Sequence, residues 1–298
     1  MGKYKICNCI FDLNFISKDF FNERFHQYEY AGNKPAKYII HFKLTSKIAT
    51  QNGEKLLTTK NGIRYKINDT QYEDLYKNNE VVTRITNNNN QYLIQLKTDL
   101  TDLKSSEYSL STLLFTEIMR KEKIAVMHAS AISYNNQAIL FSAPSGTGKS
   151  TQAELWINNI ENSIYINDDK PALSIDNEKI IVWGNPWSGK TLNNNNLKVP
   201  LKAIVYLEQA KNNEVLQLND FDKVKYTMMN LGISSKIEDN EFIIEFCNEL
   251  ISRTEIYLFK CNMSNNAPKE LVNAIFIKSS KKRKRLLKSF KHDTMKCK

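Results

Sequence analysis

The chain has 298 residues, of which 41% are hydrophobic and 25% are charged. Those proportions are ordinary for a folded globular protein, and the length allows one large core or two modest ones. No apolar run is long enough for a membrane-spanning helix, and the first residues lack the basic-then-apolar order of a signal peptide. The five cysteines show no metal-binding spacing, so we expect reduced thiols in a cytoplasmic protein.

The net charge of +10 is concentrated at the C-terminus. Residues 278–298 hold ten Lys or Arg against one acid, Asp293, so they carry +9 and the rest of the chain about +1. The body therefore has no broad basic surface, and neither a nucleic-acid nor a membrane partner is expected. We expect residues 279–298 to form a disordered basic tail, and docking of an acidic leader peptide is the alternative role.

Residues 1–108 are expected to form a β-rich N-terminal region. Short runs rich in Ile, Val, Tyr and Thr predict strands, and clusters of Asn and Gly between them predict turns. The predicted strands are KYKICNCIF, KYIIHFKLT, GIRYKIN, EVVTRIT and QYLIQLKTD. Cys7 and Cys9 alternate along the first of these and are interpreted as small hydrophobic residues on one strand face. His26 and His41 are isolated, so this region either supports the other half or presents a partner surface.

Residues 109–278 are expected to form a second domain. Its first element is a predicted helix over residues 109–121, with Ser109 as the N-cap. A hairpin follows, with strands over 124–133 and 138–141 and a turn at Asn135-Asn136.

The predicted strand at 138–141 continues into the sequence SAPSGTGKST, at residues 142–151. A strand, a glycine-rich loop and a helix form a phosphate-binding P-loop, with the pattern G-x-x-x-x-G-K-[ST]; here Ala143 replaces the first glycine. Lys149 would reach the β- and γ-phosphates, and the Ser150 hydroxyl would ligate Mg²⁺. The predicted nucleotide-binding residues of this loop are Ser145, Gly146, Thr147, Gly148, Lys149, Ser150 and Thr151. A chance loop of Gly and Ser is the alternative.

Two adjacent carboxylates, Asp168 and Asp169, follow an apolar predicted strand about twenty residues after the P-loop lysine. Mg²⁺ bound to a nucleotide requires oxygen ligands beyond the loop hydroxyl. The pair therefore indicates the second element of a nucleotide site, and a turn or helix cap is the alternative.

A third unusual stretch is GNPWSGK at residues 184–190, reached by a hairpin over 172–183 that turns at Asp176-Asn177. Lys190 would neutralise phosphate and Trp187 would line a substrate pocket; a surface loop with a packed tryptophan is the alternative. Further strands are predicted over 199–207 and 255–260, and further helices over 220–232, 239–252 and 269–278. Alternating strands and helices predict an α/β fold.

Taken together, HASA at residues 128–131, the P-loop, INDDKPAL, GNPWSGK and VPLKAIVYLEQ resemble the C-terminal catalytic domain of HPr kinase/phosphorylase. They look most like the branch found beside bacterial peptide-modification genes. The resemblance covers roughly residues 122–278. It implies the fold that this family shares with ATP-dependent phosphoenolpyruvate carboxykinase, here preceded by the β-rich region, and it allows a homo-oligomer.

The resemblance also implies roles for individual residues. Asp169 would bind Mg²⁺ together with Ser150, and Asp168 would take the proton from an acceptor hydroxyl. His128 matches a histidine near the transferred phosphate, although a half-buried strand histidine is an equal alternative. Two departures are Ala129, where HPr kinases have glycine, and the loop at 184–190, which replaces an Arg-Gly loop that handles the protein substrate. HPr itself is therefore in doubt as the acceptor.

The sequence thus predicts a kinase that uses ATP and Mg²⁺ to phosphorylate a Ser or Thr hydroxyl of a peptide or protein, such as a ribosomal peptide precursor. A small-molecule kinase or a carboxykinase-like enzyme is one alternative, although Arg253 is the only arginine between the P-loop and the tail and a carboxykinase needs more. A nucleotide-binding module without catalysis is another, and Asp168 and Asp169 argue against it.

Overall fold

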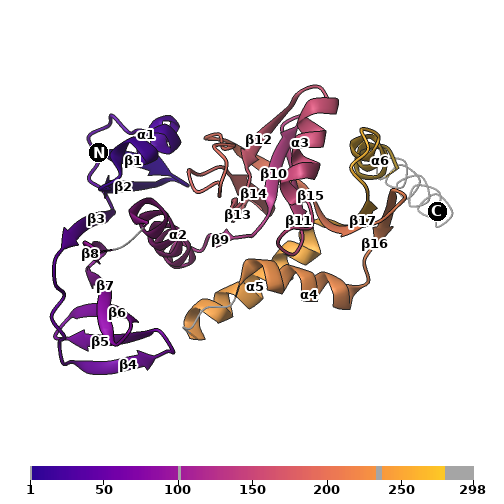
Figure 1. Cartoon of the computed structure of the whole chain (residues 1–298). Coiled ribbons are helices and arrows are strands. Elements are labelled where there is room, and N and C mark those ends of the chain that lie inside the picture. Colours follow the sequence, from indigo (N-terminus) through magenta and orange to yellow (C-terminus); the bar gives the residue numbers. More distant parts are fainter. Residues whose placement is uncertain (1, 100–101, 233–236, 279–298) are drawn as a thin grey trace, which may run out of the picture. The chain divides into compact units, whose positions relative to one another are not determined.

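The structure is a computed structural model that describes residues 2–99, 102–232 and 237–278 (Figure 1). The predicted basic tail at 279–298 lies outside the described residues. The chain divides into two compact units, Met1–Phe115 and Thr116–Lys298. The division falls within helix α2 (Leu103–Lys121), whereas the sequence analysis placed the domain boundary after residue 108. None of the helices in the described ranges is long and apolar enough to cross a membrane.

The first unit is built on one sheet with the strand order β1-β2-β3-β8-β7-β6-β5-β4. Neighbouring strands are antiparallel except for the parallel pairs β2–β3 and β3–β8. The strands are β1 (Lys3–Ile6), β2 (Cys9–Asn14), β3 (Tyr38–Thr45), β4 (Glu54–Thr58), β5 (Gly62–Ile67), β6 (Thr70–Lys77), β7 (Glu80–Asn88) and β8 (Gln91–Lys97). A short helix, α1 (Lys18–Phe25), and a 3₁₀ turn (His26–Tyr28) lie between β2 and β3. The β-rich character of this region is therefore confirmed.

The first predicted strand is wrong in one respect, because KYKICNCIF is a hairpin and not a single strand. Cys7 and Asn8 form its two-residue turn with φ of 48° and 65°, the left-handed backbone of a tight hairpin. Cys7 therefore lies in a turn rather than on a strand face with Cys9, although both thiols are buried. Helix α1 was not predicted; its Phe21 and Phe25, four residues apart, are both fully buried.

The second unit contains a mixed sheet with the order β12-β10-β11-β15-β14-β13-β9, and β17 and β16 continue from β15. Its strands are β9 (Ala125–Val126), β10 (Ser130–Tyr134), β11 (Gln137–Ser142), β12 (Ser163–Asn167), β13 (Ala172–Asp176), β14 (Lys179–Trp183), β15 (Lys198–Gln209), β16 (Glu214–Gln217) and β17 (Glu255–Cys261). The long strand β15 pairs with β14 through its first residues, and then runs parallel to both β11 and β17.

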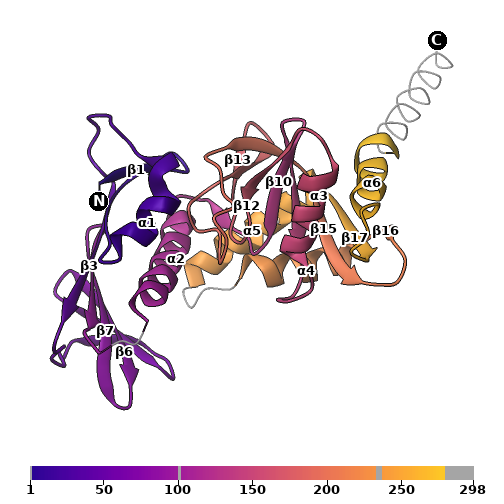
Figure 2. The same ribbon diagram turned by 45° about the horizontal axis from the view of Figure 1, so that its top comes forward.

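Helices cover both faces of this sheet, which gives three layers (Figures 1 and 2). One face packs against α3 (Lys149–Asn159), α6 (Ala267–Val272) and a π-helical turn (Asn273–Lys278), and the other against α4 (Asp220–Leu231) and α5 (Ile237–Arg253). Alternate residues of β11 serve the two faces: Ile139 and Phe141 join the α3 layer, while Ala138 and Leu140 join the α4–α5 layer. The predicted α/β class is confirmed.

Several predicted boundaries differ from the structure. Helix α2 begins at Leu103, and its cap is Asp102, whose Oδ1 accepts a hydrogen bond of 3.0 Å from Ser105 N; Ser109 lies inside the helix and is not the N-cap. The β13–β14 hairpin turns at Asn177-Glu178, one residue later than predicted. The turn at Asn135-Asn136 is confirmed, with φ of 49° and 57°.

Sheet topology brings the predicted site residues to one edge. Strand β10 is antiparallel to both β11 and β12, so the ends of β11 and β12 lie beside the start of β10. The glycine-rich loop follows β11, the two carboxylates follow β12, and His128 immediately precedes β10. Three stretches that are far apart in sequence therefore meet.

Candidate active site

The loop between β11 and α3 has the backbone of an anion cradle. Gly146 and Gly148 adopt φ of 81° and 110°, which a residue with a side chain rarely adopts. The loop then leads into α3, whose first N–H groups have no intrahelical partner and lie at the positive end of the helix dipole. Ser145, Gly146 and Ser150 are exposed, so the loop faces solvent and can receive a phosphate.

Lys149 is the first residue of α3 and is buried. Its Nζ donates a hydrogen bond of 3.0 Å to Ala143 O, across the mouth of the loop. Burial lowers the pKa of Lys149, while the nearby charges of Asp169 and Asp168 raise it. A phosphate in the loop would add to the counter-charge that these two carboxylates supply.

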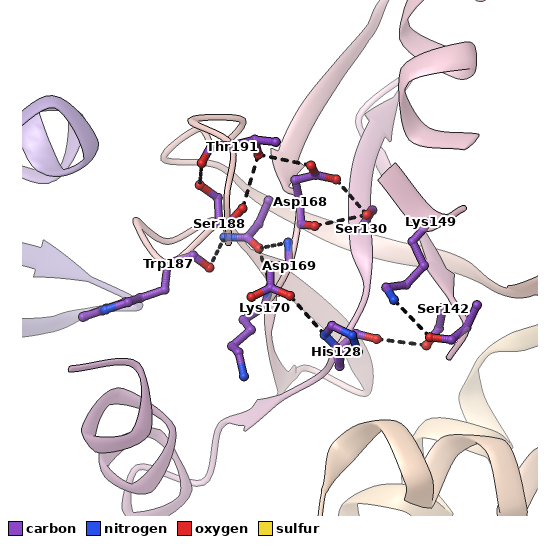
Figure 3. Close-up of polar contacts among 12 residues, drawn as sticks. His128, Ser130, Ser142, Lys149, Asp168, Asp169, Lys170, Trp187, Ser188 and Thr191 are labelled. Atoms are coloured by element: carbon purple, nitrogen blue, oxygen red, sulfur yellow. Dashed lines mark hydrogen bonds and ion pairs between the residues drawn. The ribbon is translucent and has the colours of Figure 1, made fainter. Parts of the chain in front are cut away.

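Asp168 is held in place by two hydroxyl groups. It accepts hydrogen bonds from Ser130 Oγ at 2.7 Å and from Thr191 Oγ1 at 3.1 Å (Figure 3). The carboxyl group is almost fully buried; burial raises its pKa, and these two hydrogen bonds together with the nearby Ser150 hydroxyl partly offset that rise. The loop hydroxyl and the first carboxylate are therefore direct neighbours.

Asp169 is more accessible than Asp168 and faces His128. Its Oδ1 lies 3.1 Å from His128 Nδ1, and the side chains are 23% and 42% exposed (Figure 3). His128 is itself fixed by its backbone, because its N–H donates to Asn230 O and its carbonyl accepts from Ser142 Oγ, each at 2.9 Å. The predicted strand over 124–133 is wrong at this point, because it is interrupted between β9 and β10 and His128 lies in the bend between them. The partly exposed histidine thus places its ring against the second carboxylate.

Asn167 organises this edge, and sequence reasoning missed it. Its Oδ1 accepts from Asp169 N at 2.9 Å and from Lys170 N at 2.6 Å, which shapes the turn that carries both carboxylates. Its Nδ2 donates to Asn185 O at 2.9 Å and to Trp187 O at 3.2 Å. The side chain is fully buried. The signal was an asparagine at the last position of an apolar strand, where a hydrophobic residue would be expected.

The loop that follows β14 is folded around these carboxylates. Gly184 leaves no room for a side chain, because a Cβ there would lie 1.8 Å from Asn195 O. Gly189 has a φ of 73°, and its Cβ would lie 2.9 Å from the Cβ of Asp169. Asn185 closes the loop by donating to Lys170 O at 2.7 Å. The glycines are therefore needed for close approach to the carboxylate turn.

The same loop holds Trp187 and Lys190, for which the sequence predicted a pocket wall and a phosphate contact. Trp187 is fully buried, and its ring points away from Asp168 and Asp169, which fits the packed tryptophan rather than a pocket wall (Figure 3). Lys190 is exposed. Thr191, which was not predicted as a site residue, is the member of this segment that binds Asp168.

The donor set fits a magnesium ion. Within the described ranges, no group of three or more His, Cys, Asp or Glu is placed to hold a metal ion by itself. The Ser150 hydroxyl lies near the Asp168 carboxyl group, and Asp169 follows directly, so a hydroxyl and two carboxylates gather beside the loop. Hard oxygen ligands that leave room for phosphate and water suit Mg²⁺.

Comparison with known proteins adds a remote similarity. No family model matches the chain, and no curated protein matches it significantly. Among solved structures, the Hpr(Ser) kinase/phosphatase from Coxiella burnetii is similar over 53% of this chain and 98% of its own, at 15% sequence identity and a TM-score of 0.33. At that TM-score the similarity supports no argument about function, so the proposal below depends on the site itself.

Proposed function

We propose that this chain is a kinase that uses ATP and Mg²⁺ to phosphorylate a Ser or Thr hydroxyl of a peptide or protein. The observation that carries the proposal is the meeting of Lys149, Ser150 and the Asp168–Asp169 pair at one sheet edge. A phosphate cradle alone would suit any nucleotide-binding protein, whereas a cradle beside two carboxylates also offers a base for an acceptor hydroxyl.

The loop and Lys149 would bind the triphosphate. Backbone N–H groups at the start of α3 would donate to phosphate oxygens, and the Lys149 ammonium would leave Ala143 O to contact the β- and γ-phosphates. Because Lys149 is buried, its charge acts through a weakly screened environment. These groups would stabilise negative charge on the transferred group.

Ser150 and Asp168 would hold the magnesium ion, which when bound offsets charge on the phosphate oxygens. The closeness of the Ser150 hydroxyl to the Asp168 carboxyl group, which lowers the pKa of Asp168, favours this pairing. The sequence-based expectation placed Asp169 on the metal and Asp168 as the base; the geometry favours the opposite assignment. Ser130 and Thr191 would keep the Asp168 carboxylate oriented toward the loop.

Asp169 would act as the general base, because it is the more exposed carboxylate. It would accept the proton of the acceptor hydroxyl while the hydroxyl oxygen bonds to the γ-phosphorus and the bond to the β-phosphate oxygen breaks, which releases ADP. His128, 3.1 Å from Asp169, would orient that carboxylate. The class of acceptor rests on the motif resemblance described above.

The test is phosphoryl transfer from γ-labelled ATP to a pool of peptides that contain Ser or Thr. Label in phosphoester linkage and ADP release that depends on peptide are the expected results, and Lys149→Ala should lower both by about a hundredfold or more. Lys179→Ala removes an exposed lysine of the same unit and should have no effect. Label that enters only small-molecule alcohols would contradict the acceptor class, and nucleotide binding without turnover would indicate a regulatory module.

The two aspartates can be distinguished in the same assay. Asp169→Asn should abolish transfer while leaving affinity for MgATP near wild type, since it removes the base. Asp168→Asn should raise the Mg²⁺ concentration needed for nucleotide binding. The opposite pattern would restore the sequence-based assignment.

A further inference from the structure

A cavity of about 650 Å³ adjoins the glycine-rich loop. It lies at the end of β11 and β15, on the sheet face that carries α4. Its lining residues are His128, Ser142, Ala143, Pro144, Ser145, Gly146, Thr147, Tyr206, Leu207, Glu208, Gln209, Tyr226, Met229, Asn230 and Leu258. The proposed chemistry uses only the wall that the loop and His128 form, and leaves the rest of this volume without a role.

The cavity has a polar side and an apolar side. The loop residues and His128 form the polar side, which is continuous with the proposed phosphate cradle. Tyr206, Leu258, Tyr226 and Met229 form the apolar side. A ligand that fills such a cavity combines a phosphate-bearing end with a flat or apolar body, because polar groups fix its orientation and apolar groups cover its surface.

Helix α4 supplies the apolar side through one stripe of side chains. Tyr226, Met229 and Asn230 are spaced three and four residues apart and face the cavity, while Thr227 and Leu231 are buried in the core. The Tyr226 ring stacks on that of the buried Tyr206, with centroids 5.1 Å apart and planes 30° apart. The helix is therefore a fixed wall and needs no rearrangement to receive a ligand.

Met229 is 67% exposed, a high value for a methionine on the wall of a cavity. An exposed thioether beside an aromatic ring forms an adaptable surface for a planar group. The cavity is also lined by Asn230, Glu208 and Gln209, whose side chains can hydrogen-bond the polar edges of such a group.

The position of the cavity selects its occupant. Strand β15 lies on the opposite side of β11 from β10 and β12. His128, just before β10, lines the cavity and contacts Asp169, whereas residues 206–209 of β15 line the part of the cavity beside that strand. Gln209, at the end of β15, donates to Thr147 O of the loop at 3.4 Å. A triphosphate whose γ-phosphate lies at Lys149 and the carboxylates therefore extends its α-phosphate toward β15. The acceptor must attack in line from the carboxylate side, which leaves the β15 side for the rest of the donor.

We infer that this cavity holds the base and ribose of the nucleoside triphosphate, with the base packed against Tyr226 and Met229. The inference rests on the proposed function, because it takes the loop as the triphosphate site. Base stacking on an aromatic side chain contributes roughly 1–3 kcal/mol per base, which corresponds to about fivefold to a hundredfold in affinity. The ribose hydroxyls would meet the polar groups at the rim.

The experiment compares ATP with inorganic tripolyphosphate, which carries the phosphates and lacks the nucleoside. Binding of each, with Mg²⁺, is measured by isothermal titration calorimetry. Tyr226→Ala should weaken ATP binding about tenfold and leave tripolyphosphate binding unchanged, and Tyr226→Phe should retain ATP affinity. Met229→Ala should also weaken only ATP binding, and because Met229 is largely exposed this variant will fold. Phe221→Ala is the matched control, since Phe221 is 76% exposed on the same helix and does not line the cavity.

The outcomes separate this inference from the proposed function. The inference is overturned if the Tyr226→Ala and Met229→Ala variants both bind ATP with wild-type affinity. If those variants also show a raised KM for a peptide acceptor, the cavity belongs to the acceptor. Equal losses for ATP and tripolyphosphate also overturn it, because the loss then lies in the cradle. If the wild-type protein binds neither compound, or Lys149→Ala binds both normally, the proposed function itself fails.

Discussion

Replacing Asn167 with alanine should strongly destabilise the second unit, although this residue contacts no proposed substrate. Its amide holds the turn that carries Asp169 and Lys170 through two accepted hydrogen bonds, and holds the following loop through donations to Asn185 O and Trp187 O. The side chain is fully buried, so water cannot replace these partners without entering the core.

The magnitude follows from these four contacts. A typical intramolecular hydrogen bond contributes about 1 kcal/mol net, and a buried polar group left without a partner costs about 1–3 kcal/mol. Asn167→Ala should therefore lower the free energy of unfolding by about 3–4 kcal/mol, which is large for a single substitution. Asn167→Asp keeps the accepting oxygen, but it replaces the donor with a buried charge that faces two carbonyl groups, so it should be at least as destabilising.

The assay is urea unfolding followed by tryptophan fluorescence. All three tryptophans, at positions 156, 183 and 187, belong to the second unit, so the signal reports that unit alone. Asn159→Ala is the matched control, because it removes one hydrogen bond of 2.8 Å to Leu155 O and should cost about 1 kcal/mol. If Asn167→Ala loses no more than Asn159→Ala, the hydrogen-bond network around the carboxylates is not the organising element described here.

Three further predictions concern the same unit. Gly189→Ala places a Cβ 2.9 Å from the Cβ of Asp169, on a backbone with a φ of 73°. Phosphoryl transfer should therefore fall more than about tenfold while affinity for MgATP is retained. Equal transfer rates in the variant and the wild-type protein would refute the close contact. Burial raises the pKa of Asp168 above its ordinary 3.8, so the wild-type protein loses stability as the pH rises from 3.8 through the raised pKa. Asp168→Asn does not titrate and should therefore gain stability relative to wild type as the pH rises above 3.8, and a constant difference in urea unfolding would contradict this. Burial raises the pKa of Cys247 and of Cys261 to about 11. Iodoacetamide at pH 7.5 should therefore label both thiols slowly in the native protein and rapidly in urea, which mass spectrometry can map. Fast labelling of the native protein would contradict this prediction.

Local sequence signals predicted the strand-loop-helix around Lys149 and the carboxylates after β12. Both depend on residues next to each other in the chain: glycines that permit a left-handed backbone, and an apolar run that ends in Asp-Asp. The Asn135-Asn136 turn was predicted for the same reason, since asparagine tolerates a positive φ.

Contacts between distant residues could not be predicted in this way. Asn167 bonds to residues 18 and 20 positions away, and Thr191 reaches Asp168 across 23 positions, so no spacing rule indicates either. The hairpin at Cys7-Asn8 was missed because cysteine is not a usual turn residue. Helix α1 was missed because two buried phenylalanines in eight residues give a weak helical pattern.

The most direct test of the account is the fate of the γ-phosphoryl group in single-turnover mixtures of enzyme, γ-labelled ATP and Ser/Thr peptides. We predict label in phosphoester linkage on peptide hydroxyls with the wild-type protein and the Lys179→Ala control, and none with Lys149→Ala or Asp169→Asn. Transfer that survives in both of those variants, or a wild-type protein that binds ATP and transfers nothing to any hydroxyl, would contradict the proposal that this sheet edge is a phosphotransferase site.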